Sequence, residues 1–222
     1  MIHQLTHCPV GRSIRVPGRP RLFSWQRELQ IKMGRPREPE IGAIRHRYEA
    51  EGVEGFYAKQ GADYRNPHEP VIRRLIGEAV RHWGVDLGSV LDLACGSGEV
   101  TLALRECGAG RIDGIDPYTG AAYLKRTGHE AERYRFEEIA TGVLEGRRYQ
   151  LVVCSFALHL LDESWLPSLL FNLARMTDRL LILTPHKRPE INPAWGWNCA
   201  GEILTERVRA RLYTTGPANM IS

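Results

Sequence analysis

Between residues 89 and 185 the chain alternates short apolar runs with amphipathic segments. The apolar runs have the length of buried strands, and the segments between them carry apolar residues at helical spacing. Alternation of this kind predicts a parallel, doubly wound α/β sheet (a Rossmann-like fold) with helices on both faces. Ligands of such sheets bind at the carboxyl ends of the strands, so a site is expected in the loops that follow them.

The same periodicity sets the expected element boundaries. Strands are expected at 89–95, 111–117, 132–138, 149–156 and 178–185. An amphipathic helix opens at Pro70, and further helices are expected at 98–107, 119–128 and 163–176. Ser164 is the expected N-cap of the last of these, with Pro167 in its first turn.

The end of the chain offers two more elements. GEILTE, which begins at Gly201, is expected to form a short helix. The following RVRARLYTT alternates arginines with apolar residues, which predicts a last strand at a sheet edge with one wet face.

The net charge of +4 is unevenly distributed along the 222 residues. The first 40 residues hold eight basic and three acidic residues and five of the 13 prolines, so they carry +5 and the remaining 182 residues carry −1. We therefore expect residues 1–38 to be a basic, flexible tail and residues 39–222 to be the folded domain. The tail suits a nucleic-acid arm, a targeting segment or an unstructured extension, and a start at Met33 is a further alternative.

Composition excludes several classes of protein. The 43% hydrophobic and 25% charged content is that of a globular protein, and no run of 18 apolar residues that could form a transmembrane helix occurs. The five cysteines are scattered and form no C-x-x-C pair. That argues against a disulfide framework and a zinc site, and it favours a reducing, cytoplasmic location without a bound metal.

The strongest motif is VLDLACGSGEV, in which the first strand of the alternation runs into Gly96-Ser97-Gly98 and then a helix. Glycines let the backbone approach a ligand closely, and the helix start offers free N–H groups. Asp92 lies four residues before Gly96 and would repel a pyrophosphate, whereas Asp116 ends the second strand and can accept both hydroxyls of a ribose. A positively charged cofactor without phosphate fits this combination.

The loop allows two other interpretations. A ligand-free turn between strand and helix, with Asp116 as a helix cap, would use the same residues. A dinucleotide-dependent dehydrogenase is disfavoured by Asp92 and by Thr101, which occupies the third glycine position of G-x-G-x-x-G.

VLDLACGSGEVTLAL, GIDPY and YQLVVCSFALHLL, in this order, resemble the motifs of the class I S-adenosylmethionine-dependent methyltransferases. The resemblance covers about residues 86–186 and extends over 40–215. Ala94 stands where the family often has its first glycine. The resemblance implies an enzyme with S-adenosylmethionine as cofactor, and lid helices ahead of the first strand.

The resemblance also implies roles for single residues. Asp92 would orient the ammonium end of the cofactor, and Ala94, Gly96, Ser97 and Gly98 would form the loop around its methionine part and ribose. Asp116 would bind the ribose hydroxyls. The adenine would meet Pro117, Tyr118, Phe136 and Glu137, with Glu138 as an alternative, and the sulfonium and methyl would meet Ser155 and Phe156.

The methyl acceptor leaves weaker signals. His159, four residues after Ser155, is a candidate general base, or a histidine that merely bonds backbone. His186 is a second candidate, beside Lys187 and Arg188, which would bind an acidic substrate or lie in solvent. Trp195 and Trp197 would wall the acceptor site or, as we prefer, close the edge of the core.

The stretch DYRNPHEP adds further candidates ahead of the helix that opens at Pro70. Its polar and ring side chains would reach the acceptor if the preceding helices form a lid, or the Asn-Pro pair would simply cap that helix. The acceptor-binding candidates here are Tyr57, Tyr64, Arg65, Asn66 and His68.

These observations favour methyl transfer to an O or N atom of a small molecule. Methylation of RNA or protein, with the basic tail as a docking arm, is the alternative. SFAL (155–158) replaces the Asn-Pro-Pro-aromatic motif of amino-directed base methyltransferases, which disfavours a flipped base. A cofactor-binding module without catalysis is a third possibility, and no membrane partner is expected.

Overall fold

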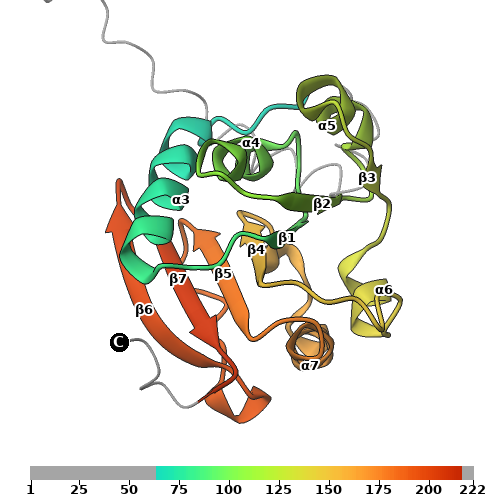
Figure 1. The fold of residues 1–222 in the computed structure, drawn as a ribbon. Helices are drawn as coiled ribbons and strands as arrows, with labels where there is room; N and C mark the ends of the chain where they lie inside the picture. Colours follow the sequence, from blue (N-terminus) through green and yellow to red (C-terminus); the bar gives the residue numbers. More distant parts are fainter. Residues whose placement is uncertain (1–63, 217–222) are drawn as a thin grey trace, which may run out of the picture. The chain divides into compact units, whose positions relative to one another are not determined.

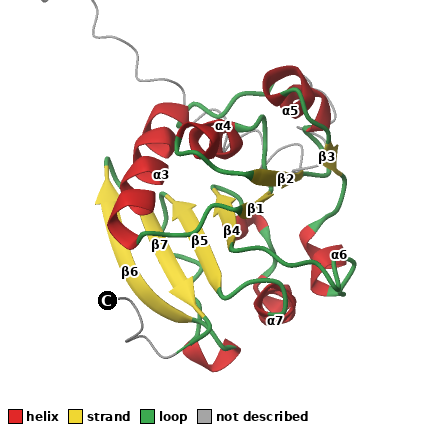
Figure 2. Cartoon of the chain, viewed as in Figure 1, coloured by secondary structure: helices red, strands yellow, loops and turns green. Residues whose placement is uncertain are grey.

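A computed structural model describes residues 64–216, shown by chain position in Figure 1 and by secondary structure in Figure 2. The tail at 1–38, the expected lid helices and Tyr57 lie outside the described residues. The strands are β1 Ser89–Leu93, β2 Arg111–Ile115, β3 Ala131–Glu132, β4 Leu151–Ser155, β5 Arg179–Thr184, β6 Asn198–Thr205 and β7 Val208–Thr214. The α-helices are α3 Glu69–Trp83, α4 Glu99–Glu106, α5 Gly120–Thr127, α6 Phe136–Ala140 and α7 Leu166–Ala174. Three 3₁₀ turns lie at η2 Leu158–Leu160, η3 Glu163–Trp165 and η4 Pro193–Trp195.

The strands form one sheet in the order β3-β2-β1-β4-β5-β7-β6. Strands β1 to β5 pair in parallel, whereas β7 runs antiparallel to both β5 and β6. The chain starts in the middle with β1, moves outward to β3 and then returns to β4 on the other side of β1. This reversal between β1 and β4 is the point where a doubly wound sheet binds its ligand, and the predicted fold class is confirmed.

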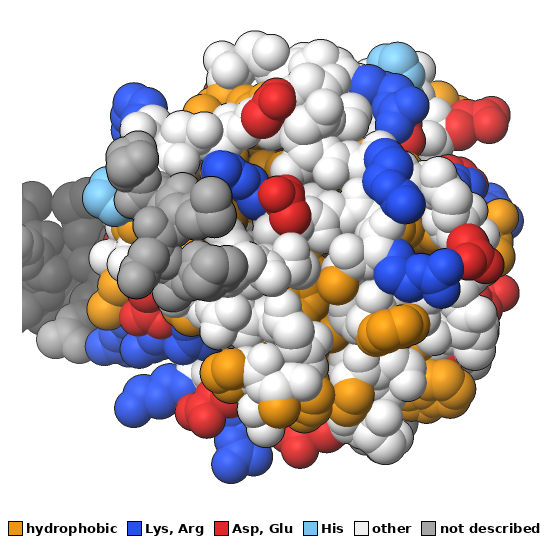
Figure 3. All heavy atoms as spheres, turned by 60° about the horizontal axis from the view of Figure 1, so that its bottom comes forward, with side chains coloured by type: hydrophobic (Ala, Val, Ile, Leu, Met, Phe, Trp, Pro, Cys, Tyr) orange, Lys and Arg blue, Asp and Glu red, His pale blue; other side chains and the backbone are white. Residues whose placement is uncertain are grey.

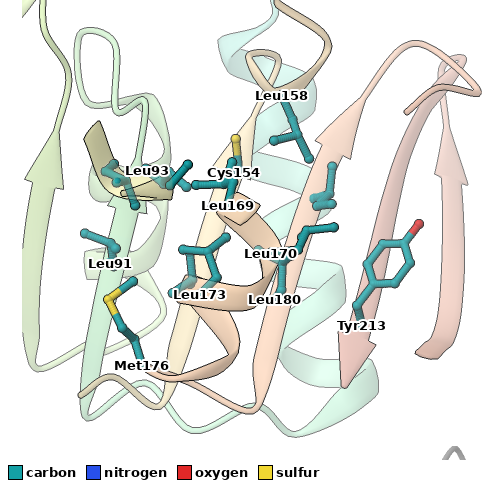
Figure 4. Packing of buried hydrophobic residues seen from close by; sticks show 14 of the residues in the cluster. Leu91, Leu93, Cys154, Leu158, Leu169, Leu170, Leu173, Met176, Leu180 and Tyr213 are labelled. Atoms are coloured by element: carbon teal, nitrogen blue, oxygen red, sulfur yellow. The ribbon is translucent and has the colours of Figure 1, made fainter. Parts of the chain in front are cut away.

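Helices cover both faces of the sheet because its central strands are apolar on both sides. Leu91, Val152 and Leu180 pack under α6 and α7, and their strand neighbours Val90, Val153 and Leu181 pack under α3 and α4. Figure 4 shows how the leucines of α7 lie over the side chains of β1, β4 and β5, with Tyr213 of β7 at the margin. Because the central strands are buried on both faces, their ends and the loops that follow them are held in place.

The strand expected at 132–138 is wrong beyond its first residue. Only Ala131–Glu132 pairs with β2, and Phe136–Ala140 forms the helix α6. The backbone N–H of Arg135 donates to the Glu138 carboxylate at 2.8 Å, and this bond, from the residue before the helix to its third residue, starts the helix. Phe136 and Glu137 therefore project from a helix and not from a strand.

The short helix expected at 201–206 is also wrong. These residues extend β6, which pairs with β7 from Asn198↔Thr214 to Thr205↔Val208. Glu206 and Arg207 both have positive φ (50° and 68°), as in the two-residue turn that suits the twist of a hairpin. The arginine-rich strand β7 is consequently internal, and β6 is the edge. Arg211 does not face only solvent, because its Nε donates to Glu202 on β6 at 2.6 Å.

The helix expected at 163–176 exists, but its start differs. Asp162, not Ser164, provides the cap: its carboxylate accepts the Ser164 N–H at 2.8 Å and opens the turn η3, from which α7 continues at Leu166. A carboxylate two residues earlier competed successfully with the serine hydroxyl, which donates to the same oxygen. Pro167 lies in the first turn of α7, as predicted.

Candidate active site

A cavity of about 220 Å³ opens at the carboxyl ends of β1, β2 and β4, next to the reversal of the sheet. One side, which we term the glycine-loop wall, comprises residues 93–100 and 116–118. A second part, termed the β4 wall, consists of the lining residues among 155–161 (Ser155, Phe156, Ala157, Leu160 and Leu161), and residues 134–137, segment 64–69 and Ile72 of α3 complete the lining. The predicted site residues that line it are Tyr64, Asn66, Ala94, Gly96, Asp116, Pro117, Tyr118, Phe136, Glu137, Ser155 and Phe156.

The two glycines of the loop have different duties. Gly96 has a φ of 56°, and a Cβ added there would lie 3.4 Å from both Tyr64 and Glu99, two side chains that line the cavity. Its missing side chain thus leaves room for a ligand against the backbone. Gly98 has a φ of 91° and does not line the cavity; a Cβ there would lie 2.5 Å from Thr127 Cγ2, so this glycine permits α4 and α5 to pack.

Asp116 is held at the cavity by backbone donors. Its Oδ1 accepts the N–H groups of Tyr118 (2.8 Å) and Thr119 (2.9 Å), and its Oδ2 accepts the N–H of Gly96 at 3.1 Å. The carboxylate therefore caps the turn before α5 and fixes the glycine loop, as the ligand-free interpretation expects, while also lining the cavity. Oδ1 already accepts two donors, whereas Oδ2 accepts one and keeps capacity for a further donor, so capping and ligand binding are compatible.

Asp92 lies behind the glycine loop and does not line the cavity. Its Oδ2 accepts the backbone N–H (3.0 Å) and hydroxyl (2.7 Å) of Thr101, whereas Oδ1 has no hydrogen-bond partner among the described residues. Burial raises the pKa of this carboxyl to about 7, with the neighbouring Glu99 charge acting in the same direction. Ser97 is likewise fully buried behind the loop, and its hydroxyl donates to Glu99.

The β4 wall begins with a strained residue. Phe156 has a φ of 56°, a conformation that costs a residue with a Cβ about 1–2 kcal/mol. Its ring stacks on His68 with centroids 4.7 Å apart, and burial lowers the pKa of that histidine, so His68 is neutral at pH 7. Beside it, the buried Ser155 Oγ has no partner within residues 64–216. Strain and an unpaired hydroxyl at one cavity wall are typical of a ligand site.

The two histidines proposed as bases lie together outside the lining. His159 and His186 are both exposed, with ring centroids 4.8 Å apart in an edge-on arrangement. Lys187 and Arg188 are exposed beside them, and Arg188 lies 3.8 Å from Glu163. Arg65 also faces solvent. Neither histidine lines the cavity, but Leu160, the chain neighbour of His159, does.

The tryptophans after β5 close the core, as preferred from the sequence. Trp197 is fully buried, and its indole N–H donates to the Leu170 carbonyl on α7 at 3.0 Å. Trp195 packs against the same apolar cluster, and neither lines the cavity.

Several lining residues escaped the sequence interpretation. Glu99 is almost fully buried, follows the glycine loop directly and accepts three hydrogen bonds. Its acidic type at a helix start was a readable signal. Arg135 lies over the Tyr118 ring at 5.8 Å, an interaction between elements that no local pattern reveals. The other unpredicted lining residues are Ile72, Leu93, Cys95, Val100, Tyr134, Ala157, Leu160 and Leu161.

Residues 64–216 contain neither a candidate metal centre nor a helix that could span a membrane. No group of three or more His, Cys, Asp or Glu side chains could hold a metal ion there. No helix in this part of the chain is long and apolar enough to cross a membrane.

Residues 90–179 match the sequence model of a methyltransferase domain. The chain is 34% identical to an uncharacterized protein of Schizosaccharomyces pombe, over 74% of this chain and 89% of the relative. The fold of this chain is similar to that of an O-methyltransferase family protein from Burkholderia thailandensis (TM-score 0.55, 17% identity, 85% of this chain and 69% of that one). It is also similar to magnesium protoporphyrin IX methyltransferase from Synechocystis, solved with bound S-adenosylmethionine (TM-score 0.50, 17% identity, 78% and 94%).

Proposed function

This chain belongs to the class I S-adenosylmethionine-dependent methyltransferases, and on that premise we propose that it methylates an O or N atom of a small-molecule acceptor. S-adenosylmethionine supplies a methyl group already activated on a sulfonium, so the protein needs to bind, align and dehydrate the reactants. The proposal has three parts: where the cofactor is held, what the acceptor meets, and whether a base is needed.

The residues of the glycine-loop wall fit this cofactor. Gly96 lines the cavity without a side chain, so a ligand can approach the backbone there, and Asp116 offers its Oδ2 to a ribose hydroxyl. Tyr118 and Phe136 supply flat rings for an adenine, with Glu137 beside them. No pyrophosphate is required, and none would suit a wall that already carries Glu99 and Asp116.

The observation that carries the small-molecule proposal is the chemistry of the β4 wall. Phe156, Ala157, Leu160 and Leu161 present apolar surface next to the hydroxyl of Ser155, which has no hydrogen-bond partner among the described residues. A largely apolar surface with a few placed polar groups is typical of sites for small molecules. We infer an acceptor that places an apolar body on this wall and a single polar atom near Ser155.

The alternative acceptor, RNA or protein, rests on the +5 charge of the first 40 residues. A nucleic-acid surface requires clustered basic side chains. On the face drawn in Figure 3, basic and acidic side chains are interspersed with exposed apolar ones, which supports the small-molecule proposal over a phosphate-binding surface.

A general base is required for a phenol, hydroxyl or protonated amine, but not for a carboxylate. We keep His159 and His186 as proposed bases because they sit together beside Leu160. Their exposure means that a proton would reach them from the rim of the cavity. His159→Ala with unchanged turnover at neutral pH would remove His159 from this role, and the same comparison applies to His186→Ala.

The acceptor is tested by transfer of labelled methyl from S-adenosylmethionine. The full chain is offered small-molecule extracts, RNA and protein fractions in parallel, and turnover confined to the small-molecule fraction is expected. Deletion of residues 1–38 is expected to keep both cofactor affinity and turnover. Loss of turnover with cofactor affinity kept would instead establish the docking-arm alternative.

A further inference from the structure

Segment 64–69 reaches both walls of the cavity. Tyr64 and Asn66 contribute to the lining, and the Asn66 N–H donates to Glu99 Oε1 on the glycine-loop wall at 3.0 Å. Two residues later, the ring of His68 stacks on Phe156 of the β4 wall. The segment therefore contacts both sides.

The attachment at Glu99 involves a charged side chain that is almost fully buried. The Glu99 side chain is only 4% exposed, and its Oε1 also accepts from Arg126 Nη1 at 2.9 Å and from the Ser97 hydroxyl. A carboxylate buried to this degree requires a charged partner or full hydrogen bonding. Arg126, at the end of α5, is that partner and is 13% exposed.

Arg126 joins three elements through one guanidinium. Besides Glu99, its Nη1 donates to the hydroxyl of Ser97 at 3.0 Å, and its Nη2 bonds Glu69, the first residue of α3. The planar fork of arginine suits such a junction, and lysine cannot reproduce it. One cation thus holds the glycine loop, the end of α5 and the end of segment 64–69 in fixed relation.

We propose that Glu99 and Arg126 are positioning residues that couple the cofactor loop to segment 64–69, and so set the geometry between bound cofactor and acceptor. The inference rests on the proposed function only in assigning S-adenosylmethionine to the glycine loop. Neither residue needs to touch the reacting atoms. Through Asn66 and His68, a shift of the glycine loop is transmitted to Phe156, where the acceptor is expected.

The test measures amide hydrogen exchange in the full chain, with and without saturating S-adenosylhomocysteine as the probe. In the native chain, the probe is expected to slow exchange both in the glycine loop and in segment 64–69. In Arg126→Met, protection of the glycine loop persists, whereas exchange in segment 64–69 becomes about tenfold faster and no longer responds to the probe. Arg73→Met, which breaks an exposed ion pair between α3 and Glu106 of α4, serves as the matched control and behaves like the native chain.

Two variants at Glu99 keep the test decisive if Arg126→Met does not fold. Glu99→Gln retains an oxygen that accepts from Asn66, so it preserves part of the coupling, whereas Glu99→Ala abolishes it. If these residues only stabilise the fold, the variants would lower the melting temperature but would change amide exchange in the glycine loop and in segment 64–69 to the same extent. Unchanged probe-dependent protection of segment 64–69 in Glu99→Ala would overturn the inference.

Failure of the proposed function has a different signature. If the native chain shows no response to the probe in either peptide, the assignment of the cofactor fails. The positioning inference is then decided by exchange without the probe: faster exchange of segment 64–69 in Glu99→Gln than in Arg73→Met supports it, and equal exchange overturns it.

Discussion

Backbone N–H groups donate hydrogen bonds that help to fix the glycine-loop wall, whereas the β4 wall carries a ring contact between residues far apart in the sequence. In the former, Gly96 N–H bonds Asp116 and the Cys95 N–H bonds the Ile115 carbonyl at 3.0 Å. In the latter, a strained Phe156 is stacked on His68, 88 positions away in the chain. A wall built from backbone demands particular residues at particular spacings. A wall built from apolar side chains tolerates exchange, and that freedom suits the part of the site that selects an acceptor.

The largest expected effect separates the two glycines of the loop. Gly98→Ala forces a Cβ at positive φ against Thr127, so we expect a loss of about 3 kcal/mol in the free energy of unfolding. Gly96→Ala meets no contact under 3.4 Å and should cost about 1 kcal/mol, but it should weaken cofactor binding. Denaturant unfolding and calorimetric titration measure the two quantities, and the reverse pattern would break the distinction between the two glycines.

The second effect concerns the buried carboxyl behind the glycine loop. Asp92 holds its proton up to about pH 7 in the folded state, whereas the unfolded chain releases it near 3.8. Its contribution to stability is therefore present below about pH 4 and is lost as the pH rises through 7. Asn does not titrate, so Asp92→Asn should gain on the native chain by on the order of 2–3 kcal/mol between pH 5 and pH 8.

Thermal or denaturant unfolding at both pH values measures this difference, and groups common to both proteins cancel. A stability difference between the two proteins that is independent of pH would mean that Asp92 is ionised in the folded chain, as a direct contact with the cofactor's ammonium would require.

A smaller effect tests the contact of Trp197 with α7. Trp197→Phe keeps most of the buried ring but leaves the Leu170 carbonyl without its donor, so about 1 kcal/mol of stability should be lost. Because Trp197 does not line the cavity, cofactor affinity should stay unchanged. Phe171→Ser is the control, because Phe171 lies beside Leu170 on α7 and its ring is 61% exposed. This variant should leave stability within about 0.5 kcal/mol of the native value. A fall in affinity in Trp197→Phe would place this tryptophan in the site after all.

The smallest effect on stability is expected at the β4 wall itself. Ser155→Ala removes a buried hydroxyl that has no partner within the described chain, so the free energy of unfolding should change by less than about 0.5 kcal/mol. Methyl transfer to the true acceptor should nevertheless fall, because the only polar group on this wall is lost. Equal turnover with stability retained would show that Ser155 does not meet the acceptor.

The difference between the walls also explains what the sequence could predict. The strands β1, β4 and β5 and the positions of Gly96 and Asp116 follow from local patterns, since buried parallel strands are continuous apolar runs and the turn needs glycine. The predictions for 132–138 and 201–206 were wrong because a carboxylate cap decides the structure of the first segment and a hairpin partner that of the second. The pair Glu99–Arg126 joins residues 27 positions apart and leaves no periodic trace.

The central claim is that the cavity beside Gly96 and Asp116 binds S-adenosylmethionine, and calorimetric titration tests it most directly. Asp116→Asn is the matched variant, because it keeps an oxygen for the N–H groups of Tyr118 and Thr119 while it removes the charge and the acceptor of the Gly96 N–H. We predict binding at one site per chain in the native protein, and affinity at least about tenfold weaker in the folded variant. No binding by the native chain, or equal affinity in Asp116→Asn, would contradict the account.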